Sequence, residues 1–528
     1  MLKSKMRFLS FVVLYSIATI ALYNITFWDK IIKSFSVSTT QDAFFIIQFA
    51  LILITLHIVF YSIIFVKPFT KSLSIILLYI NAAATYFISH YGISIDYNMI
   101  TNVLNTDLKE ASDLLSFYLL GYIVVLGLIP HIIIVNATII YQSFWKEVLQ
   151  RIVCGVSLII ICLGMILFNY KELSIFIRSN KDNLGYLIPR NYLYSIIKLG
   201  RLYFKQDLKT HTIGEDAKNN SQDKMLVVLI IGEAARKHNF SLYGYTRETN
   251  PHLKKIKNLV VFNNTTSCGT STAVSLPCIF SYLDREHFIK NSKQYEFLPS
   301  LLSKQNIDVT WIENNFGGCK KTCNNVKTIN TQHLNIKEFC DTGECVDGIL
   351  VDQFEKQIKI SPTQNTVIVL HQNGSHGPKY NKRYPKEFEK FKPVCTTTNL
   401  SKCSKEELIN AYDNTILYTD YTIYKVITKL NSMPIPSLVM YISDHGESLG
   451  EYNIYLHGFP YMIAPKEQKE IPFLMWLSPS LSKKINLKCL NQKSSYSHDN
   501  IFHSILGIFN ISTSIYKKSN DIFADCQK

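Results

Sequence analysis

The chain has 528 residues, 47% of them hydrophobic, and a formal net charge of +15 at pH 7. A chain of this length has room for more than one folding unit. An excess of positive charge is compatible with nucleic acid or with anionic lipid as a partner, so charge alone excludes neither. The hydrophobic residues are unevenly spread along the chain, and their distribution indicates the class of protein.

Long apolar stretches fill the first third of the chain. Each is close to the ~20 residues that an α-helix needs to cross the hydrocarbon core of a membrane. We therefore predict a transmembrane domain of five helices over residues 1–168, with membrane lipids and not nucleic acid as the partner of the basic charge. The stretches cover residues 8–27, 43–66, 70–89, 118–141 and 152–168.

The charges between these stretches predict an orientation. Lysine and arginine gather before the first, third and fifth stretches, whereas the loop 91–117 is mainly acidic. Basic loops stay on the cytoplasmic side, so five spans leave everything after residue ~170 outside the cytoplasmic membrane. The first stretch resembles a signal peptide, but without a small-residue cleavage pattern we interpret it as a retained anchor.

The cysteines support an extracytoplasmic location. Two of the twelve lie in the fifth stretch and ten follow residue 260, mostly as close pairs. Such spacing is typical of disulfides in an oxidising compartment. CKKTC and CDTGEC also resemble zinc-ligand pairs, but nothing nearby completes a tetrahedral set. The expected pairs are 268/278, 319/323, 340/345 and 395/403, which leaves Cys489 and Cys526 as candidates for a fifth.

Residues 169–224 separate the membrane region from the rest. Residues 169–205 mix basic residues with tyrosine, phenylalanine, leucine and isoleucine, and residues 206–224 are polar. Aromatic and basic residues together suit a helix in the membrane interface. We therefore predict an interfacial helix and a linker over residues 169–224, followed by a C-terminal domain over residues 225–528.

Short apolar runs that end abruptly in polar residues recur after residue 225. Continuous apolar runs separated by helical lengths indicate buried parallel strands and an α/β sheet. Ligands bind beyond the carboxyl ends of such strands, so the polar residues there should gather. The runs cover residues 225–231, 309–312, 366–370 and 438–442.

Several residues near these strand ends are of metal-ligand type. Glu233 follows the first run, Asp444-His445 follows the last, and His376 and His457 lie in nearby loops. Taken singly, Glu233 fits a helix cap, Asp444-His445 fits an ordinary turn, and the two loop histidines fit surface residues. Together with a hydroxyl they make an oxygen and nitrogen site for zinc, which activates an alcohol as a nucleophile.

The stretch SCGTSTAVSLPC, residues 267–278, supplies candidate hydroxyls. If a helix begins at its centre, the helix N-terminus would favour an alkoxide or a phosphate there. Spacing alone does not decide which hydroxyl would face the metal. The candidates are Thr270, Ser271, Thr272 and Ser275.

Five motifs, in order after the apolar stretches, resemble the lipid A phosphoethanolamine transferases, including the enzymes of transferable polymyxin resistance. The resemblance covers essentially the whole chain and implies an extracytoplasmic domain with the alkaline phosphatase/sulfatase-like α/β fold. The motifs are IGEAARKHNFSLYGYTRETNP, SCGTSTAVSLPC, HQNGSHGPKYNKRYPKEFEKFKPVC, SDHGESLGE and YLHGFPY.

The resemblance also implies an activity. It makes Thr272 the nucleophile, which takes phosphoethanolamine from phosphatidylethanolamine and passes it to a phosphate of lipid A. Glu233, Asp444 and His445 match zinc ligands, with the Thr272 oxygen as the fourth, and one or two zinc ions are expected. The enzyme would be an inner-membrane protein with a periplasmic catalytic domain, expected as a monomer.

Further residues match substrate-binding positions of the family. His376 and His457 match histidines that bind the substrate phosphate or a second zinc and assist proton transfer. Lys320 resembles a basic residue near the phosphate, although NNFGGCK is one residue longer than the commonest form. The loop NVLNTDLKE matches headgroup-contacting residues at Asn102, Thr106 and Glu110, which otherwise read as helix caps.

Three alternatives remain open at this point. The acceptor could be the lipopolysaccharide core, a periplasmic glucan or a surface protein. A phosphoglycerol transferase shares the fold and the five spans, but the paired cysteines fit it poorly. A catalytically inactive membrane sensor or scaffold is disfavoured because the candidate nucleophile and metal ligands are all present.

Overall fold

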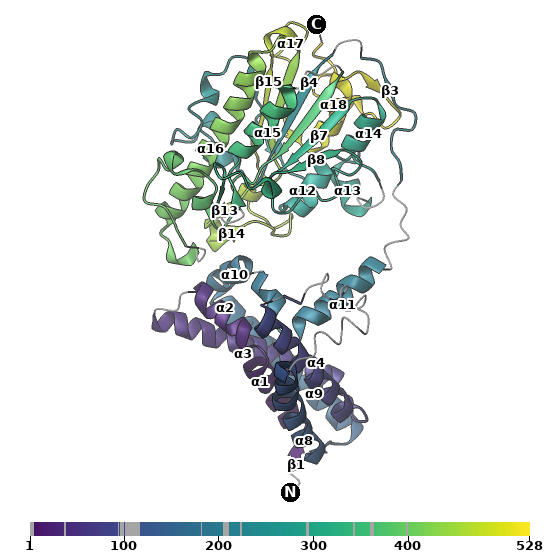
Figure 1. The fold of residues 1–528 in the computed structure, drawn as a ribbon, viewed down its shortest axis with the longest axis vertical. Coiled ribbons are helices and arrows are strands. Elements are labelled where there is room, and N and C mark those ends of the chain that lie inside the picture. Colours follow the sequence, from purple (N-terminus) through teal and green to yellow (C-terminus); the bar gives the residue numbers. More distant parts are fainter. Residues whose placement is uncertain are drawn as a thin grey trace. The chain divides into compact units, whose positions relative to one another are not determined.

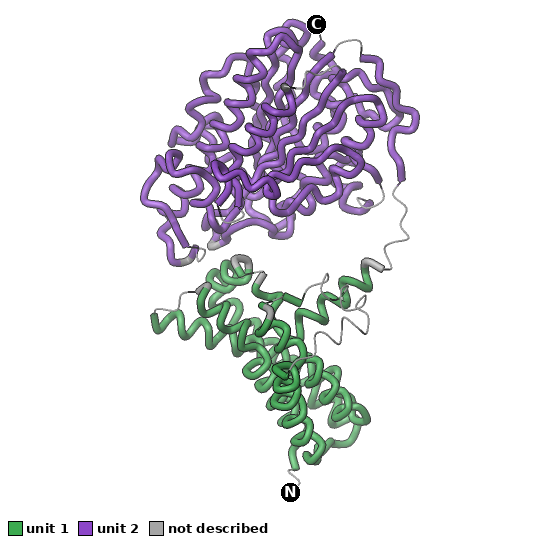
Figure 2. The backbone as a smooth tube through the Cα atoms, in the orientation of Figure 1, with its two compact units in different colours: residues 1–207 green, residues 208–528 purple. Residues whose placement is uncertain are grey.

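The computed structural model forms two compact units, residues 1–207 and residues 208–528 (Figures 1 and 2). Each unit has its own hydrophobic core. The described residues are 5–35, 39–92, 94–95, 100, 117–180, 182–203, 211–221, 224–291, 295–341, 344–359, 364–397 and 400–527.

In the described part of the first unit, four helical stretches are long and apolar enough to span a membrane. Two of them leave most of their apolar side chains exposed, as lipid-facing helices do. The stretches are α3 (Thr40–Ile64), α4 (Thr70–Tyr91), the stretch Phe117–Asn136, which contains α7 (Phe117–Tyr122) and α8 (Ile129–Asn136), and α9 (Phe144–Phe168).

The first expected span is broken. Helix α1 (Phe8–Leu22) is followed by α2 (Ile25–Phe35) with a bend of 58° between them. Asn24 lies at the break, where its side-chain amide donates to Thr19 O over 2.8 Å and its Oδ1 accepts from the N–H of Ile188 over 2.7 Å. The helix ends where this polar side chain bonds to the backbone of α1 and to that of a distant segment. The number of spans reaches the predicted five when the bent pair counts as one.

Two shorter helices end the first unit, α10 (Tyr170–Ser179) and α11 (Arg190–Tyr203). Helix α11 exposes Tyr194, Ile196 and Ile197 on a helix that also carries basic residues. This combination is typical of a helix in the membrane interface. The interfacial placement of residues 169–205 stays a prediction.

The second unit is built on a seven-stranded sheet. The four strands predicted from apolar runs form its centre and pair in parallel, so this prediction is confirmed. Strand β15 runs antiparallel to both of its neighbours, β12 and β5. The order is β5 (Leu259–Val261), β15 (Phe473–Leu477), β12 (Ser437–Ser443), β4 (Leu226–Gly232), β11 (Thr366–His371), β7 (Asp308–Glu313) and β8 (Lys327–Asn330).

Helices cover both faces of this sheet (Figure 1). Alternate residues of β4, such as Val227 and Leu229, pack in one core with α12 (Thr272–Ile279), α14 (Leu298–Lys304) and α18 (Asp499–Ile508). The intervening Val228 and Ile230 are equally buried, on the side of α15 (Gly348–Lys359) and α16 (Lys405–Asn431). The continuous apolar strands thus reflect burial on both faces.

Five disulfides join the ten cysteines that follow residue 260. Each joins a cysteine to the next one along the chain. The bonds are Cys268–Cys278, Cys319–Cys323, Cys340–Cys345, Cys395–Cys403 and Cys489–Cys526, whereas Cys154 and Cys162 in α9 are free.

Candidate metal centre and nucleophile

Two neighbouring strands bring the acidic and histidine residues together. Strand β4 ends beside β12, with Gly232 paired to Ser443, so the residues that follow each strand meet. These are Glu233, Asp444 and His445, and the side chains of all three are fully buried. The sheet therefore places these side chains at the edge where ligands of α/β proteins bind.

Thr272 completes this cluster. It is the first residue of α12, and its Oγ1 lies 2.9 Å from Glu233 Oε2 and 3.3 Å from His445 Nε2. His445 Nε2 lies 3.4 Å from Glu233 Oε1 and 3.3 Å from Asp444 Oδ2. Four side chains thus direct polar atoms at one point, at a helix N-terminus that favours negative charge.

The other hydroxyls of the turn have different partners. Thr270 donates to Phe459 O, and Ser275 accepts from the N–H of Gly269. Ser271 caps α12 without a side-chain cap hydrogen bond. Among the hydroxyls left open by spacing, Thr272 is the one bonded to the acidic and histidine cluster.

The donor set fits a divalent metal ion. Glu233 Oε1 and Asp444 Oδ2 are buried and have no hydrogen-bond partner, which is costly unless a cation or water satisfies them. The Nδ1 of His445 donates to the carbonyl of Gly446 over 2.8 Å, which turns Nε2 toward the carboxylates. One ligand atom from each of the three side chains lies within 4.8 Å of the others. Oxygen and nitrogen donors in this number suit zinc.

The electrostatics of the cluster favour a positive charge. Burial and the charge of Glu233 raise the pKa of Asp444 to about 6. Burial opposes a charge on His445, but Asp444 and Glu233 outweigh it and raise the pKa of that imidazole to about 10. Burial also opposes ionisation of Glu233, yet the adjacent imidazole of His445 outweighs burial and holds the pKa of that carboxyl below its ordinary value. The two carboxylates thus draw a cation to His445 Nε2, and a metal ion and a proton compete for that place.

Two partly exposed histidines lie beside the buried cluster. The His457 ring centroid is 4.3 Å from that of His445 and 5.5 Å from that of His376. Burial lowers the pKa of His376 to about 4. His457 Nδ1 lies 2.8 Å from Glu447 Oε2, which fixes the orientation of the ring. Ligand atoms of His376, His457 and Glu233 also lie within 4.8 Å of one another, so a second ion has donors here.

Sequence reasoning missed two residues of the site. Asn315 follows β7, and its Nδ2 donates to Glu233 Oε2 over 2.7 Å. Glu447 is buried and holds both His457 and the hydroxyl of Tyr380. Both residues stand among the polar residues that follow predicted strands, which is the signal that could have found them.

The remaining predicted residues are not brought into the cluster. Lys320 is exposed, and its Nζ donates to the carbonyl of Gly317 in the loop that follows Asn315. Asn102, Thr106 and Glu110 lie outside the described residues. The substrate-binding roles of all four stay predictions.

Comparison with known proteins identifies the family. Residues 52–203 match the phosphoethanolamine transferase EptA/EptB family, and residues 225–511 match the sulfatase family. Phosphoethanolamine transferase EptA of Escherichia coli K12 is 38% identical, over 96% of this chain and 94% of its own. The chain belongs to the phosphoethanolamine transferase family.

Two solved structures agree with this family assignment. The integral membrane protein lipooligosaccharide phosphoethanolamine transferase A of Neisseria meningitidis superposes with a TM-score of 0.68 at 33% identity, covering 99% of this chain and all of its own. The C-terminal periplasmic domain of phosphoethanolamine transferase EptC of Campylobacter jejuni is 42% identical, with a TM-score of 0.53, over 59% of this chain and 97% of its own. This phosphoethanolamine transferase is therefore a multi-pass membrane protein with a sulfatase-like catalytic domain in the periplasm.

Proposed function

We propose that this enzyme transfers phosphoethanolamine from phosphatidylethanolamine to a phosphate of lipid A, through a covalent intermediate on Thr272 at a zinc site. The observation that carries the proposal is the bonding of the Thr272 hydroxyl to Glu233 and His445. Zinc would be held by Glu233, Asp444, His445 and the Thr272 oxygen. When bound, the ion lowers the pKa of the hydroxyl and offsets charge on the phosphoryl oxygens.

In the first half of the reaction, Thr272 Oγ1 attacks the phosphorus of phosphatidylethanolamine. A bond forms between that oxygen and phosphorus, and the bond from phosphorus to the glycerol oxygen breaks. The hydroxyl gives up its proton and the departing diacylglycerol gains one. We assign assistance in this proton transfer to His376 and His457, and their partial exposure beside the buried cluster supports this role.

In the second half, a phosphate oxygen of lipid A attacks the phosphorus held on Thr272. The bond from phosphorus to the threonine oxygen breaks, and the hydroxyl is restored by a proton. The sequence is a double displacement, and one site serves both halves. Glu447 holds the His457 ring in place throughout, because its carboxylate is fully buried and bonded to Nδ1.

The membrane unit supports lipids as both donor and acceptor. Phosphatidylethanolamine, which carries the group to be transferred, is itself a membrane lipid. The Neisseria relative is named a lipooligosaccharide phosphoethanolamine transferase, and a relative of Escherichia coli K12 is named a Kdo(2)-lipid A phosphoethanolamine transferase. An added ethanolamine amine offsets a phosphate charge, so we expect weaker binding of polymyxin and other cationic peptides.

Threonine substitutions test the proposal. Thr272→Ala removes the nucleophile, so we expect no phosphoethanolamine on lipid A in cells that express it. Thr272→Ser keeps a hydroxyl and should keep measurable transfer. Ser271→Ala is the matched control, since it removes the neighbouring hydroxyl, which makes no cap hydrogen bond, and should retain transfer. Mass spectrometry of lipid A measures the product, and peptide mass spectrometry measures the phosphoethanolamine bound to Thr272.

The same spectra separate the alternatives. Transfer to lipid A by Thr272→Ala would contradict the nucleophile assignment. A Thr272-bound intermediate without modified lipid A would keep the chemistry and point to a core sugar, a glucan or a protein as acceptor. Phosphoglycerol in place of phosphoethanolamine on the Thr272 peptide would contradict the assignment of phosphatidylethanolamine as the donor.

A further inference from the structure

His498 precedes α18, and its side chain is fully buried (0% exposed). Its Nδ1 accepts a hydrogen bond from the backbone N–H of Cys268 over 3.1 Å. Its Nε2 lies 3.0 Å from the carbonyl oxygen of Ser443. Because Nδ1 accepts, the proton of the neutral ring is on Nε2, which donates to that carbonyl. One imidazole therefore joins the turn before Thr272 to the strand end before Asp444.

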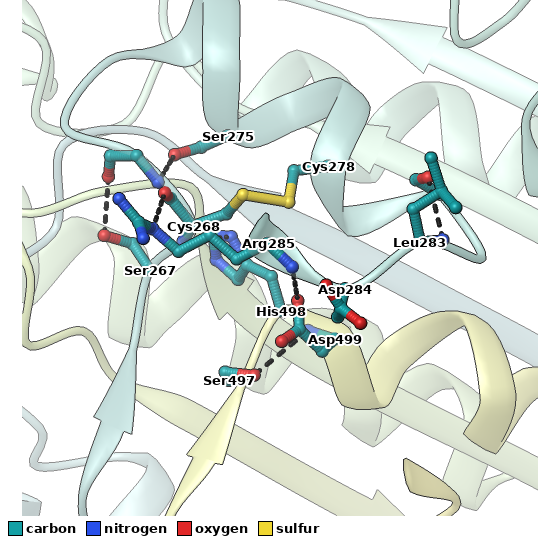
Figure 3. Close-up of a disulfide and its surroundings, with 12 residues drawn as sticks. Ser267, Cys268, Ser275, Cys278, Leu283, Asp284, Arg285, Ser497, His498 and Asp499 are labelled. Carbon is teal, nitrogen blue, oxygen red and sulfur yellow. Dashed lines mark hydrogen bonds between the residues drawn. A yellow bond between two sulfur atoms is a disulfide. The ribbon is translucent and has the colours of Figure 1, made fainter. Parts of the chain in front are cut away.

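The same turn is held from a second side. Figure 3 shows Cys268 with its disulfide, beside Arg285, His498 and Asp499. Arg285 Nε donates to the carbonyl of Cys268 over 2.8 Å, and the backbone N–H of Arg285 donates to Asp499 Oδ1 over 3.1 Å. The N–H of Cys268 is thus bonded to His498, and its carbonyl is bonded to Arg285. Arg285 in turn is held by Asp499, the residue after His498.

This arrangement matters for the distance between nucleophile and metal ligands. Thr272 and Asp444 belong to segments far apart in the chain, and His498 bonds to the backbone near each of them. A displacement of ~1 Å at a reacting atom costs on the order of a hundredfold in rate. His498 touches neither reacting atom, so any effect on rate must pass through the two segments that it joins.

We propose that His498 is a positioning residue for phosphoethanolamine transfer, holding the Thr272 turn in register with the Asp444 strand end. The inference rests on the proposed function of Thr272. It assigns to a residue outside the five family motifs the task of keeping the nucleophile in line with its metal ligands. An amide side chain presents a donor and an acceptor as the neutral imidazole does, whereas a phenyl ring presents neither.

Steady-state kinetics on the full-length enzyme in detergent, with fluorescent phosphatidylethanolamine, tests this role. We expect His498→Phe to lower kcat by about a hundredfold while KM stays within about twofold. His498→Gln should recover most of kcat. The matched control is His503→Phe, because His503 is also buried and lies on α18, but bonds to the backbone of Lys517 and Tyr282 and not to that of Cys268 or Ser443. It should lower the unfolding temperature and leave kcat unchanged.

Three outcomes would overturn the positioning role. They are an unchanged kcat per folded molecule in His498→Phe, an equal loss in His498→Gln, and an equal loss in His503→Phe. Thr272→Ala, measured beside them, separates this inference from the proposed function. If Thr272→Ala is inactive while His498→Phe is fully active, only the positioning role fails. If Thr272→Ala is active, the proposed function fails.

Discussion

At the scale of single residues, the orientation of one carboxylate decides whether the site can hold a metal ion. Oε2 of Glu233 receives hydrogen bonds from Asn315 and Thr272, and Oε1 has no hydrogen-bond partner. The same Nδ2 of Asn315 also donates to the carbonyl of Gln372, and its Oδ1 accepts from the N–H of Gly317, so both ends of the amide are fixed. A side chain that orients a ligand in this way contributes to metal affinity without touching the metal.

Asn315→Ala should therefore weaken zinc binding. Loss of such an outer partner typically costs about 10-fold to 100-fold in metal affinity or activity. Equilibrium dialysis of the full-length enzyme against zinc buffers measures the affinity directly. Gln332→Ala is the control, because Gln332 bonds to the backbone of Asn314 and not to Glu233. Equal zinc affinity of the wild type and Asn315→Ala would contradict this role.

His498 also predicts how stability depends on pH. Burial, with a smaller contribution from the positive charge of His445, lowers the pKa of His498 from 6.5 to about 4. The folded protein therefore binds a proton less readily than the unfolded chain. The stability that the neutral, buried His498 contributes is present above about pH 6.5 and is lost as the pH falls toward 4.

By pH 5 the loss amounts to about 2 kcal/mol of the free energy of unfolding. His498→Gln does not titrate, so wild type and variant should converge in unfolding temperature on going from about pH 7.5 to about pH 5. Thermal unfolding of both proteins in detergent at the two pH values measures this. The pH dependence of all other groups cancels in the comparison, and a constant difference between the proteins would contradict the prediction.

At the scale of elements, the loop after β11 fits closely against the end of β4. Gly374 has φ +50°, and a Cβ there would lie 2.7 Å from the backbone oxygen of Glu233 and 2.9 Å from its nitrogen. The carboxylate of Asp347 accepts hydrogen bonds from the N–H groups of Asn373 and Gly374, both over 2.8 Å. The loop that carries His376 is thereby held against the metal-ligand segment.

Gly374→Ala should disturb both segments. A side chain at positive φ costs about 1–3 kcal/mol, and the contact with the backbone of Glu233 adds to this. We expect at least a tenfold loss of transfer and a lower unfolding temperature. Gly244→Ala is the matched control, since Gly244 also has positive φ but a Cβ there meets nothing within 4 Å. Equal effects of the two substitutions would show that the contact with Glu233 is unimportant.

The strand ends and their meeting point could be predicted from the sequence, because continuous apolar runs indicate buried parallel strands and parallel strands share an edge. The antiparallel direction of β15 could not, since its apolar run FLMWL reads the same in either direction. The break after α1 was also missed. It depends on a bond between Asn24 and Ile188, which no local pattern contains.

The same limit applies to the site. Glu233, Asp444 and His445 follow predicted strands directly, so their meeting was expected. The choice of Thr272 needed the helix start and the partners of the other hydroxyls, or the family resemblance. His498 was not predicted at all, because its two partners are backbone groups of distant segments and a buried histidine before a helix carries no sequence signal.

At the scale of the whole molecule, the two units divide the task. The second unit contains the whole described metal cluster, its own core and all five disulfides. The first unit supplies the membrane-spanning helices. Under the proposed function, we expect the second unit to carry out the chemistry and the complete chain to be needed for access to donor and acceptor lipids in the membrane.

Residues 208–528, exported alone to the periplasm, should fold and bind zinc but fail to modify lipid A. Release from the membrane removes the high local concentration of donor and acceptor lipids. Circular dichroism and zinc content report folding, a soluble phosphoethanolamine ester reports the first half of the reaction, and mass spectrometry reports lipid A. Lipid A modified to wild-type levels by the folded, released unit would contradict this division of labour.

The order of the disulfides has a consequence for how the protein matures. Each of the five bonds joins cysteines that are consecutive in the chain, and four of them span 10 positions or fewer. As the second unit is exported, the first cysteine of each pair meets its correct partner as the next thiol to emerge. An oxidant that joins thiols in order of appearance would make all five native bonds, so we expect the bonds to form without a disulfide isomerase.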